Sequence, residues 1–327
     1  MKVIVTGASG FLGSHVAELL CAGGQDVRAL VRRSSDTSFL RTLNRVELVY
    51  GAVEDRPSVE AAVQGVDAVV HAAALVKARS SEEFVAVNVE GTRNVLDAVP
   101  ARAPGLRRFV LVSSLAAVGP SPDGRPVDPA QAAPVTRYGR SKLEAERVVT
   151  ARAQDVPVVI LRPSMIYGPR DKESLAFFQS VSRGVLPLVG AGRNTVSAVY
   201  ASDAARACLR AIDADVPSGA AFFVDDGQRY VWREMVREIE RALGKRAVVR
   251  IGLPLAVFRL VAAGAELYGR LSGKAVMLTR DKLNELAAPY WVCDSTPARE
   301  FLGWEPEVPW ADGVRRSVAW YREQGWL

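Results

Sequence analysis

The sequence is poor in the residues that build covalent or metal-linked frameworks. Its 327 residues include three cysteines and two histidines. The cysteines are odd in number, have no Cys-x-x-Cys spacing and lie within apolar helix or strand patterns, so we expect neither a disulfide framework nor a zinc site. A reducing compartment fits this usage. The cysteines are Cys21, Cys208 and Cys293.

Long apolar runs and targeting segments are also missing. Met1 leads directly into an expected strand, without a charged leader or an apolar segment before a cleavage site. The most lipid-like stretch, Leu253–Tyr268, is short for a bilayer span and carries Arg259 and Glu266. It is typical of an amphipathic helix, and contact with a membrane surface would also fit it. We expect a cytoplasmic protein without a stable membrane span.

Basic runs are missing too, although the net charge is +6, from 42 Lys and Arg against 36 Asp and Glu. These charges are spread along the chain, as on a solvated surface. Nucleic-acid binding needs clustered arginines with interleaved aromatics. The nearest cluster, Arg28, Arg32 and Arg33, lies where we expect the phosphate of a small ligand. We expect no nucleic-acid partner.

The chain does contain alternating strand and helix patterns, and 49% of its residues are hydrophobic. Short Val-rich runs separated by helical patterns predict βαβ units and a parallel sheet. Apart from Arg28 and Glu47, the runs are nearly continuously apolar, which is typical of strands covered on both faces. The first helix is expected to begin after Gly10 and to end at Gly23 and Gly24. The expected strands are Val3–Val5, Val27–Val31, Val46–Tyr50, Ala68–His71, Phe109–Ser113 and Val158–Leu161.

Residues after Pro163 change to Gly and Pro punctuation followed by longer helices. We therefore predict an α/β protein: a Rossmann-type doubly wound parallel sheet with a smaller, mostly helical substrate domain. The dinucleotide-binding domain is expected to span 1–165, with 198–224 returning to it. The substrate domain would comprise 166–197 and 225–327.

A glycine motif follows the first expected strand and opens the first expected helix. Glycines there allow a tight turn and a close approach of a diphosphate, which the N-terminal end of the helix attracts. The spacing is G-x-x-G-x-x-G, and a purely structural turn is the alternative. We predict dinucleotide binding by Thr6, Gly7, Ser9, Gly10, Phe11, Leu12 and Gly13.

The end of the second expected strand bears on which dinucleotide is bound. A carboxylate there would hold the ribose hydroxyls of NAD, but the chain has Val31 followed by Arg32 and Arg33. Guanidinium groups suit a 2′-phosphate, so NADP(H) is favoured and NAD(H) stays an alternative. The two arginines could also be exposed loop charges.

Tyr138 and Lys142 form a Y-x-x-x-K pattern on an expected helix, with i and i+4 spacing that places both side chains on one face. An ammonium beside a phenol favours phenolate. We therefore expect the pKa of Tyr138 to move toward working pH and the phenol to act as a general acid or base.

These motifs, in this order, resemble the extended short-chain dehydrogenase/reductase family, also called the NAD-dependent epimerase/dehydratase family. The resemblance covers nearly the whole chain. Besides the glycine motif and Y-x-x-x-K, it is carried by His71–Ala74, Asn88–Thr92, Val112–Ser114, Arg162–Ser164 and Tyr167–Pro169.

The resemblance implies roles for four catalytic residues. Tyr138 would exchange the proton with the substrate oxygen, Ser114 would hydrogen-bond that oxygen, and Lys142 would bind the nicotinamide ribose. Asn88 would steady a helix and the active-site water, or serve only in helix packing. We choose Ser114 over Ser113 by its position relative to the family, and expect the Ser113 hydroxyl to bond to backbone.

The resemblance also implies cofactor contacts at Ala72, Ala73, Tyr138 and Lys142, and at Pro163 and Ser164, where backbone would meet the carboxamide. The chain departs from the family at one contact. The usual Gly-Asp after the third strand is Gly51-Ala52 here, so the adenine would be held by Val53 or its neighbours.

Family members divide between sugar-nucleotide enzymes and reductases or dehydrogenases of apolar ketones and alcohols. Dehydratases resemble one another in an acidic pair after the catalytic Ser or Thr, but Ser114 is followed by Leu115–Ala117. Epimerases place an arginine a few residues before the position of Asp203, and Val196 stands there, although Arg193 is near. Both departures disfavour the sugar-nucleotide reactions.

The C-terminal region resembles 3β-hydroxysteroid dehydrogenases and dihydroflavonol reductases at 278–282, Trp291–Asp294 and Leu302–Trp304. The many apolar side chains at 253–267 would suit a hydrophobic substrate, and they would equally suit a packed core or a dimer interface. We therefore expect an oxidoreductase of small apolar ketones or alcohols. A nucleotide-sugar epimerase with tightly held NAD is the alternative, followed by a non-catalytic dinucleotide-binding module. A homodimer through the helices of Asn88 and Tyr138 is implied by resemblance only.

Overall fold

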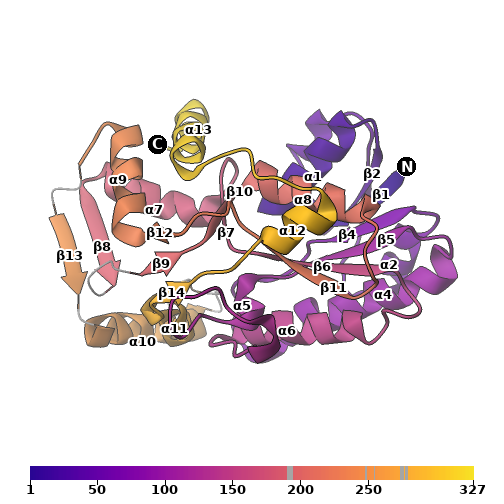
Figure 1. Cartoon of the computed structure of the whole chain (residues 1–327), viewed down its shortest axis with the longest axis horizontal. Coiled ribbons are helices and arrows are strands. Elements are labelled where there is room, and N and C mark those ends of the chain that lie inside the picture. Colours follow the sequence, from indigo (N-terminus) through magenta and orange to yellow (C-terminus); the bar gives the residue numbers. More distant parts are fainter. Residues whose placement is uncertain (190–193, 247–248, 254, 273–275, 277–278) are drawn as a thin grey trace.

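The computed structural model describes residues 1–189, 194–246, 249–253, 255–272, 276 and 279–327 (Figure 1). Its centre is a seven-stranded sheet in the order β11-β6-β5-β4-β1-β2-β3. Every pair of neighbours in this sheet is parallel. The strands are β1 (Lys2–Thr6), β2 (Asp26–Val31), β3 (Val46–Tyr50), β4 (Ala68–His71), β5 (Arg108–Val112), β6 (Val158–Pro163) and β11 (Ala220–Val224).

Helices cover both faces of the sheet (Figure 1). Because side chains alternate along a strand, Val3 and Val5 join the core under one helix layer while Ile4 joins the core under the other. This architecture confirms the predicted doubly wound α/β fold. One layer contains α1 (Phe11–Ala22) and α8 (Ala201–Asp213), and the other contains α2 (Arg56–Val63), α4 (Gly91–Arg102) and α6 (Arg137–Thr150).

The chain reverses its direction of winding between β1 and β4. From β1 it continues to β2 and β3 on one side, and it then crosses to β4, β5 and β6 on the other. Ligands of open α/β sheets bind at such a switch point, outside the carboxyl ends of the strands. The loops after β1 and β4 are therefore placed to form a site. Shorter elements between these strands are α3 (Ser81–Phe84), a π-helical segment (Val85–Glu90) and α5 (Leu115–Val118).

The C-terminal half forms a smaller unit beside the sheet. Tyr167, Phe178, Met235 and Trp310 share its core. Its strands form a β10-β7 pair, a β12-β9-β14 sheet and a β13-β8 pair. The division into two domains stays a proposal. The elements are β7 (Met165–Tyr167), α7 (Lys172–Ser182), β8 (Val185–Val189), β9 (Thr195–Val196), β10 (Ala198–Tyr200), β12 (Tyr230–Val231), α9 (Trp232–Leu243), β13 (Val249–Leu253), α10 (Leu255–Ser272), α11 (Arg280–Ala287), β14 (Tyr290–Trp291), α12 (Thr296–Leu302) and α13 (Trp310–Glu323).

One sequence expectation is wrong at Arg28. Its guanidinium is already engaged within the protein, because it donates to the Glu47 carboxylate at 2.9 Å and to the backbone oxygens of Ala62 and Gln64.

Arg193 and Leu278 lie outside the described residues. Within the described ranges, every helix is too short or too polar to cross a bilayer.

Candidate active site

A large cavity, of about 2360 Å³, opens at the carboxyl ends of the strands and continues between the C-terminal helices. It brings together most of the cofactor-binding and catalytic residues that were predicted from the sequence. Those that line it are Gly7, Ser9, Gly10, Phe11, Leu12, Gly13, Ala72, Ser114, Tyr138, Lys142, Pro163 and Ser164.

The glycine turn leaves no space for side chains at two positions. Gly7 has a φ of +71°, and a Cβ there would lie 2.7 Å from the backbone nitrogen of Ala73. A Cβ on Gly13 would collide with the carbonyl oxygen of Gly7. Helix α1 then begins after Gly10 without a side-chain cap. The turn therefore fits the diphosphate of a dinucleotide, with uncapped N–H groups at the positive end of a helix.

Thr6 acts on this turn indirectly, because its side chain is fully buried outside the cavity lining. The Ala73 N–H donates to Thr6 Oγ1 at 3.3 Å, and Thr6 Oγ1 lies 2.8 Å from His71 Nδ1. His71 Nε2 lies 2.9 Å from Thr92 Oγ1. Burial, aided by the charge of Lys142, lowers the pKa of His71 to about 3, so the ring is neutral. Thr6 and Ala73 thus join the loops after β1 and β4.

Besides Thr6 and Ala73, three predicted cofactor residues do not line the cavity. Arg32 and Arg33 are exposed, and the Arg33 guanidinium lies 5.6 Å from the centre of the Tyr50 ring. The Val53 side chain is buried, and a Cβ on Gly91 would lie 2.6 Å from its Cγ2. Their roles toward a dinucleotide stay predictions.

Sequence reasoning missed a bridge over this part of the cavity, made by Arg170 and Phe39. Both line the cavity, and the Arg170 guanidinium lies 4.0 Å from the centre of the Phe39 ring. Arg170 Nη2 also lies 2.6 Å from His15 Nδ1 and donates to Glu18 on α1 at 2.6 Å. His15 Nε2 lies 2.9 Å from the Pro169 oxygen. No local sequence signal marks this bridge, since Arg170 is far along the chain from its partners.

Tyr138 and Ser114 meet because each lies at the start of a helix. The Thr136 hydroxyl caps α6 by accepting the Gly139 N–H at 3.0 Å. The Ser114 hydroxyl caps α5 by accepting the Ala116 N–H at 3.1 Å, and it is hydrogen-bonded to the Tyr138 side chain. The two hydroxyls therefore face the cavity together.

The expected effect of Lys142 on Tyr138 is wrong for this structure. Lys142 Nζ donates to the backbone oxygen of Val112 at 2.6 Å, and burial lowers the pKa of Lys142 to about 8. The pKa of Tyr138 is not lowered. Burial raises it to about 12, with a smaller raising effect from the Glu285 carboxylate and an opposing hydrogen bond from Ser114. Tyr138 is thus a protonated phenol at neutral pH and can donate a proton.

Ser113 has a different partner from the one expected. Its hydroxyl donates to Glu146 Oε1 at 2.5 Å, not to backbone. The Glu146 carboxylate also accepts from Arg162 Nη2 at 2.7 Å. Sequence reasoning missed Glu146, although its position four residues after Lys142 places it on the same face of α6. The Glu146 charge opposes the lowering of the Lys142 pKa.

Asn88 is buried outside the cavity lining, in the π-helical segment. Its Nδ2 donates to the Leu75 oxygen at 3.0 Å and to Ser141 Oγ at 2.9 Å. Its Oδ1 accepts the Leu75 N–H at 2.7 Å. Asn88 therefore fixes the loop after β4 against α6.

The far end of the cavity is mostly apolar and aromatic. Val196, which stands where epimerases are expected to place an arginine, is part of this wall. Other large apolar side chains of the cavity lining include Phe84, Met165, Phe177, Trp232, Phe258, Leu286, Trp291, Trp310, Trp320 and Trp326.

Comparison with known proteins agrees with this geometry. The sequence pattern of the NAD dependent epimerase/dehydratase family matches residues 3–224. The ceramide reductase of Caulobacter vibrioides is 35% identical over 332 residues, which cover 99% of this chain and 96% of the relative. The 2-alkyl-3-oxoalkanoate reductase of Stenotrophomonas maltophilia is 33% identical, covering 98% of this chain and 99% of the relative.

A solved structure shows the same fold. The DesIV double mutant, a dTDP-glucose 4,6-dehydratase from Streptomyces venezuelae solved with NAD bound, superposes with a TM-score of 0.82. It is 25% identical, and the match covers 100% of this chain and 98% of that one. The resemblance inferred from the motifs is confirmed: this chain belongs to the NAD dependent epimerase/dehydratase family.

Proposed function

We propose that this chain is an NAD(P)-dependent oxidoreductase that interconverts a small apolar ketone and its alcohol. The observation that carries the proposal is the continuity of one cavity. It joins the glycine turn, the Ser114–Tyr138 pair and an apolar wall that includes Val196. The family resemblance leads us to expect an arginine at that position in epimerases. The similar reductases named above support the same reaction class.

A nicotinamide dinucleotide, when bound, supplies or accepts the hydride. Gly7, Gly10 and Gly13 would hold its diphosphate at the start of α1, where a Cβ on Gly7 or Gly13 would collide with backbone. Backbone at Pro163 and Ser164, which line the same cavity, would meet the carboxamide. Arg32 and Arg33 supply the charge that favours NADP(H) over NAD(H).

Tyr138 and Ser114 would act together on the substrate oxygen. Ser114 donates a hydrogen bond that orients the carbonyl, and Tyr138 transfers its phenolic proton to the oxygen as negative charge develops there. The raised pKa of Tyr138 keeps that proton in place at neutral pH, which suits reduction. Alcohol oxidation needs the phenolate and is expected to speed up as pH rises.

The first experiment measures which dinucleotide the purified protein holds and which it binds. Absorbance in the nicotinamide band is recorded on the protein as purified, and NADPH and NADH are then titrated by fluorescence. A protein that is purified empty, binds NADPH and oxidises it with an apolar ketone supports the proposal. NAD that co-purifies and resists removal would support an epimerase instead. Binding without turnover on any ketone or sugar nucleotide would indicate a non-catalytic module.

Tyr138→Phe tests the assigned proton donor. The variant should bind the dinucleotide with nearly unchanged affinity and lose ketone reduction by about 100-fold or more, because only the proton-exchanging hydroxyl is removed. Tyr268→Phe is the matched control, since Tyr268 is 61% exposed and does not line the cavity. Full turnover by Tyr138→Phe would refute the assignment.

A further inference from the structure

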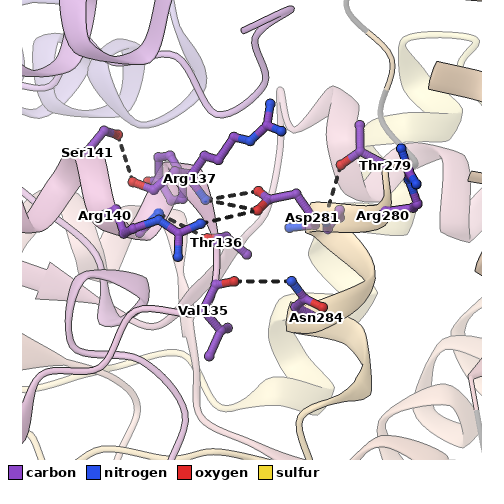
Figure 2. A network of polar contacts seen from close by, with 12 residues as sticks. Val135, Thr136, Arg137, Arg140, Ser141, Thr279, Arg280, Asp281 and Asn284 are labelled. Carbon is purple, nitrogen blue, oxygen red and sulfur yellow. Dashed lines mark hydrogen bonds and ion pairs between the residues drawn. The ribbon is translucent and has the colours of Figure 1, made fainter. Parts of the chain in front are cut away.

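Helix α11 lies across the N-terminal end of α6, the helix that carries Tyr138 (Figure 2). The Arg137 N–H donates to both carboxylate oxygens of Asp281, at 3.2 and 2.9 Å. The Arg140 guanidinium lies 3.7 Å from the same carboxylate. One turn further along α11, Asn284 Nδ2 donates to the Val135 oxygen at 3.4 Å.

This contact completes the cap of the catalytic helix. The first N–H groups of a helix have no partner within it, and a carboxylate near them is stabilising. The Thr136 hydroxyl accepts the Gly139 N–H. The Arg137 N–H therefore needs an acceptor from another segment. Asp281 supplies that acceptor from 144 residues away. The first turn of α6, including Tyr138, is thereby fixed by the C-terminal region.

Glu285 stands four residues after Asp281 and so projects from the same face of α11. Both carboxylates line the cavity that Tyr138 faces. Glu285 is also held in place, since its carboxylate accepts from Lys282 Nζ at 2.6 Å and its backbone oxygen accepts from Trp291 Nε1 at 2.9 Å. The Glu285 side chain is 27% exposed, so solvent screens its charge only in part.

We propose that Asp281 and Glu285 are positioning residues for the oxidoreductase reaction: Asp281 fixes the first turn of α6, and Glu285 places a carboxylate on the wall of the cavity that Tyr138 faces, where its negative charge disfavours the phenolate. This inference rests on the function proposed above. The raising effect of Glu285 on the pKa of Tyr138 agrees with the geometry.

Most other charged groups of this region are paired or neutral, and Glu285 itself is paired with Lys282. His71 on β4 is neutral, and Lys142 is bonded to backbone. Glu83 on α3 is paired with Arg79, and Arg280 with Glu266. The further charges are Glu82 on α3, Arg137 and Arg140 on α6, and Asp281 and Lys282 on α11. Removing the Glu285 charge leaves Lys282 without its carboxylate partner, which adds to the stabilisation of phenolate.

Glu285→Gln tests the charge with a readout that does not depend on turnover. Tyrosine rings are labelled with ¹³C at Cζ, the Tyr138 resonance is identified by its loss in Tyr138→Phe, and its ionisation is followed as pH rises. We expect Glu285→Gln to move the ionisation toward lower pH by roughly half a unit or more. Glu144→Gln removes an exposed carboxylate from the outer side of α6 and should leave the resonance unchanged.

Equal titrations in Glu285→Gln and Glu144→Gln would overturn the role of Glu285. Activity separates this outcome from failure of the proposed function. If the resonance moves as expected while no ketone or alcohol is turned over, the positioning holds and the proposed reaction is wrong. If the protein is an active reductase, Glu285→Gln should also raise the rate of alcohol oxidation at mildly alkaline pH by about threefold. A pKa that is lower by half a unit increases the phenolate fraction by about that factor.

Asp281→Asn tests the cap. We expect a fall in kcat of about tenfold with unchanged dinucleotide affinity, and a broadened Tyr138 resonance, because the first turn of α6 loses its anionic partner. Asp281→Glu should restore part of kcat. A merely structural contact would lower the melting temperature but leave kcat and the Tyr138 resonance unaltered well below it, and that result would refute the proposal.

Discussion

The phenol of Tyr138 and the ammonium of Lys142 illustrate how much one residue depends on its partners. Four-residue spacing places both on one side of α6, yet Lys142 is bonded to the Val112 oxygen and Tyr138 to Ser114. Burial then acts on the two groups in opposite directions, because it disfavours each charged form. The result is a protonated phenol beside an amine whose pKa is about 8. Spacing alone could not predict this outcome.

Arg32 and Arg33 carry a prediction about cofactor choice. Arg32→Ala combined with Arg33→Ala should weaken NADPH binding about tenfold or more and NADH binding much less, because only NADPH offers a 2′-phosphate to the guanidinium groups. Both affinities are measured by fluorescence titration. Arg93→Ala, an exposed arginine on α4, is the control and should change neither. Equal losses for the two cofactors would show that these arginines do not read the phosphate.

At the scale of elements, the turn after β1 packs against the start of α1 at Gly13. A methyl group there would strike the Gly7 oxygen and push helix and turn apart. Gly13→Ala should therefore destabilise the protein by about 1 to 3 kcal/mol and weaken dinucleotide binding, since the diphosphate cradle opens. Urea unfolding and NADPH titration measure the two effects. Gly105→Ala, where a Cβ would meet nothing within 4 Å, should be close to neutral.

Elements whose signals are local could be predicted from the sequence. Expected strands such as Val46–Tyr50 and Ala68–His71 match the structure residue for residue, because mostly apolar runs between turn residues define them. The helix after Gly10 also begins and ends as predicted. Contacts between elements that are far apart in the sequence could not be predicted. Asp281 caps a helix that begins 144 residues earlier, and no period or spacing records such a contact.

The same limit applies within the candidate site. Gly7, Ser114 and Tyr138 carry family motifs and line the cavity together. Arg170 and Glu146 carry no motif, and their importance appears only when the loops and helices that they join are in place. The expectation for Val53 came from the family pattern at the point where the chain departs from it, and the expectation for Arg32 and Arg33 came from the chemistry of a 2′-phosphate. All three residues lie outside the cavity lining.

At the scale of the whole molecule, two neutral histidines make stability depend on pH. His15 joins α1 to the loop of Pro169, and His71 joins the sheet to α4. Burial is the largest cause that lowers the pKa of each from 6.5 to about 3. Between these values the unfolded chain binds protons that the folded chain does not. Stability is therefore complete above pH 6.5 and is lost as the pH falls toward 3.

We expect the free energy of unfolding to fall by about 1.4 kcal/mol per pH unit for each histidine within that window. Urea unfolding at a series of pH values measures the slope. His15→Gln keeps a donor for the Pro169 oxygen and removes one titrating group. It should therefore reduce the slope of the free energy of unfolding against pH by the contribution of one histidine. A slope that His15→Gln leaves unaltered would assign the acid sensitivity to other groups.

Strand β11 completes one edge of the seven-stranded sheet, although it follows β7, β8, β9 and β10 in the sequence. It pairs along β6, from Ala220 opposite Val159 to Val224 opposite Pro163. A gene fragment that stops at residue 165 would therefore encode a sheet whose β6 edge is bare and apolar, which is a template for aggregation. Laboratories that wish to exchange substrate regions between relatives should accordingly keep Ala220–Val224 with the sheet that this strand completes.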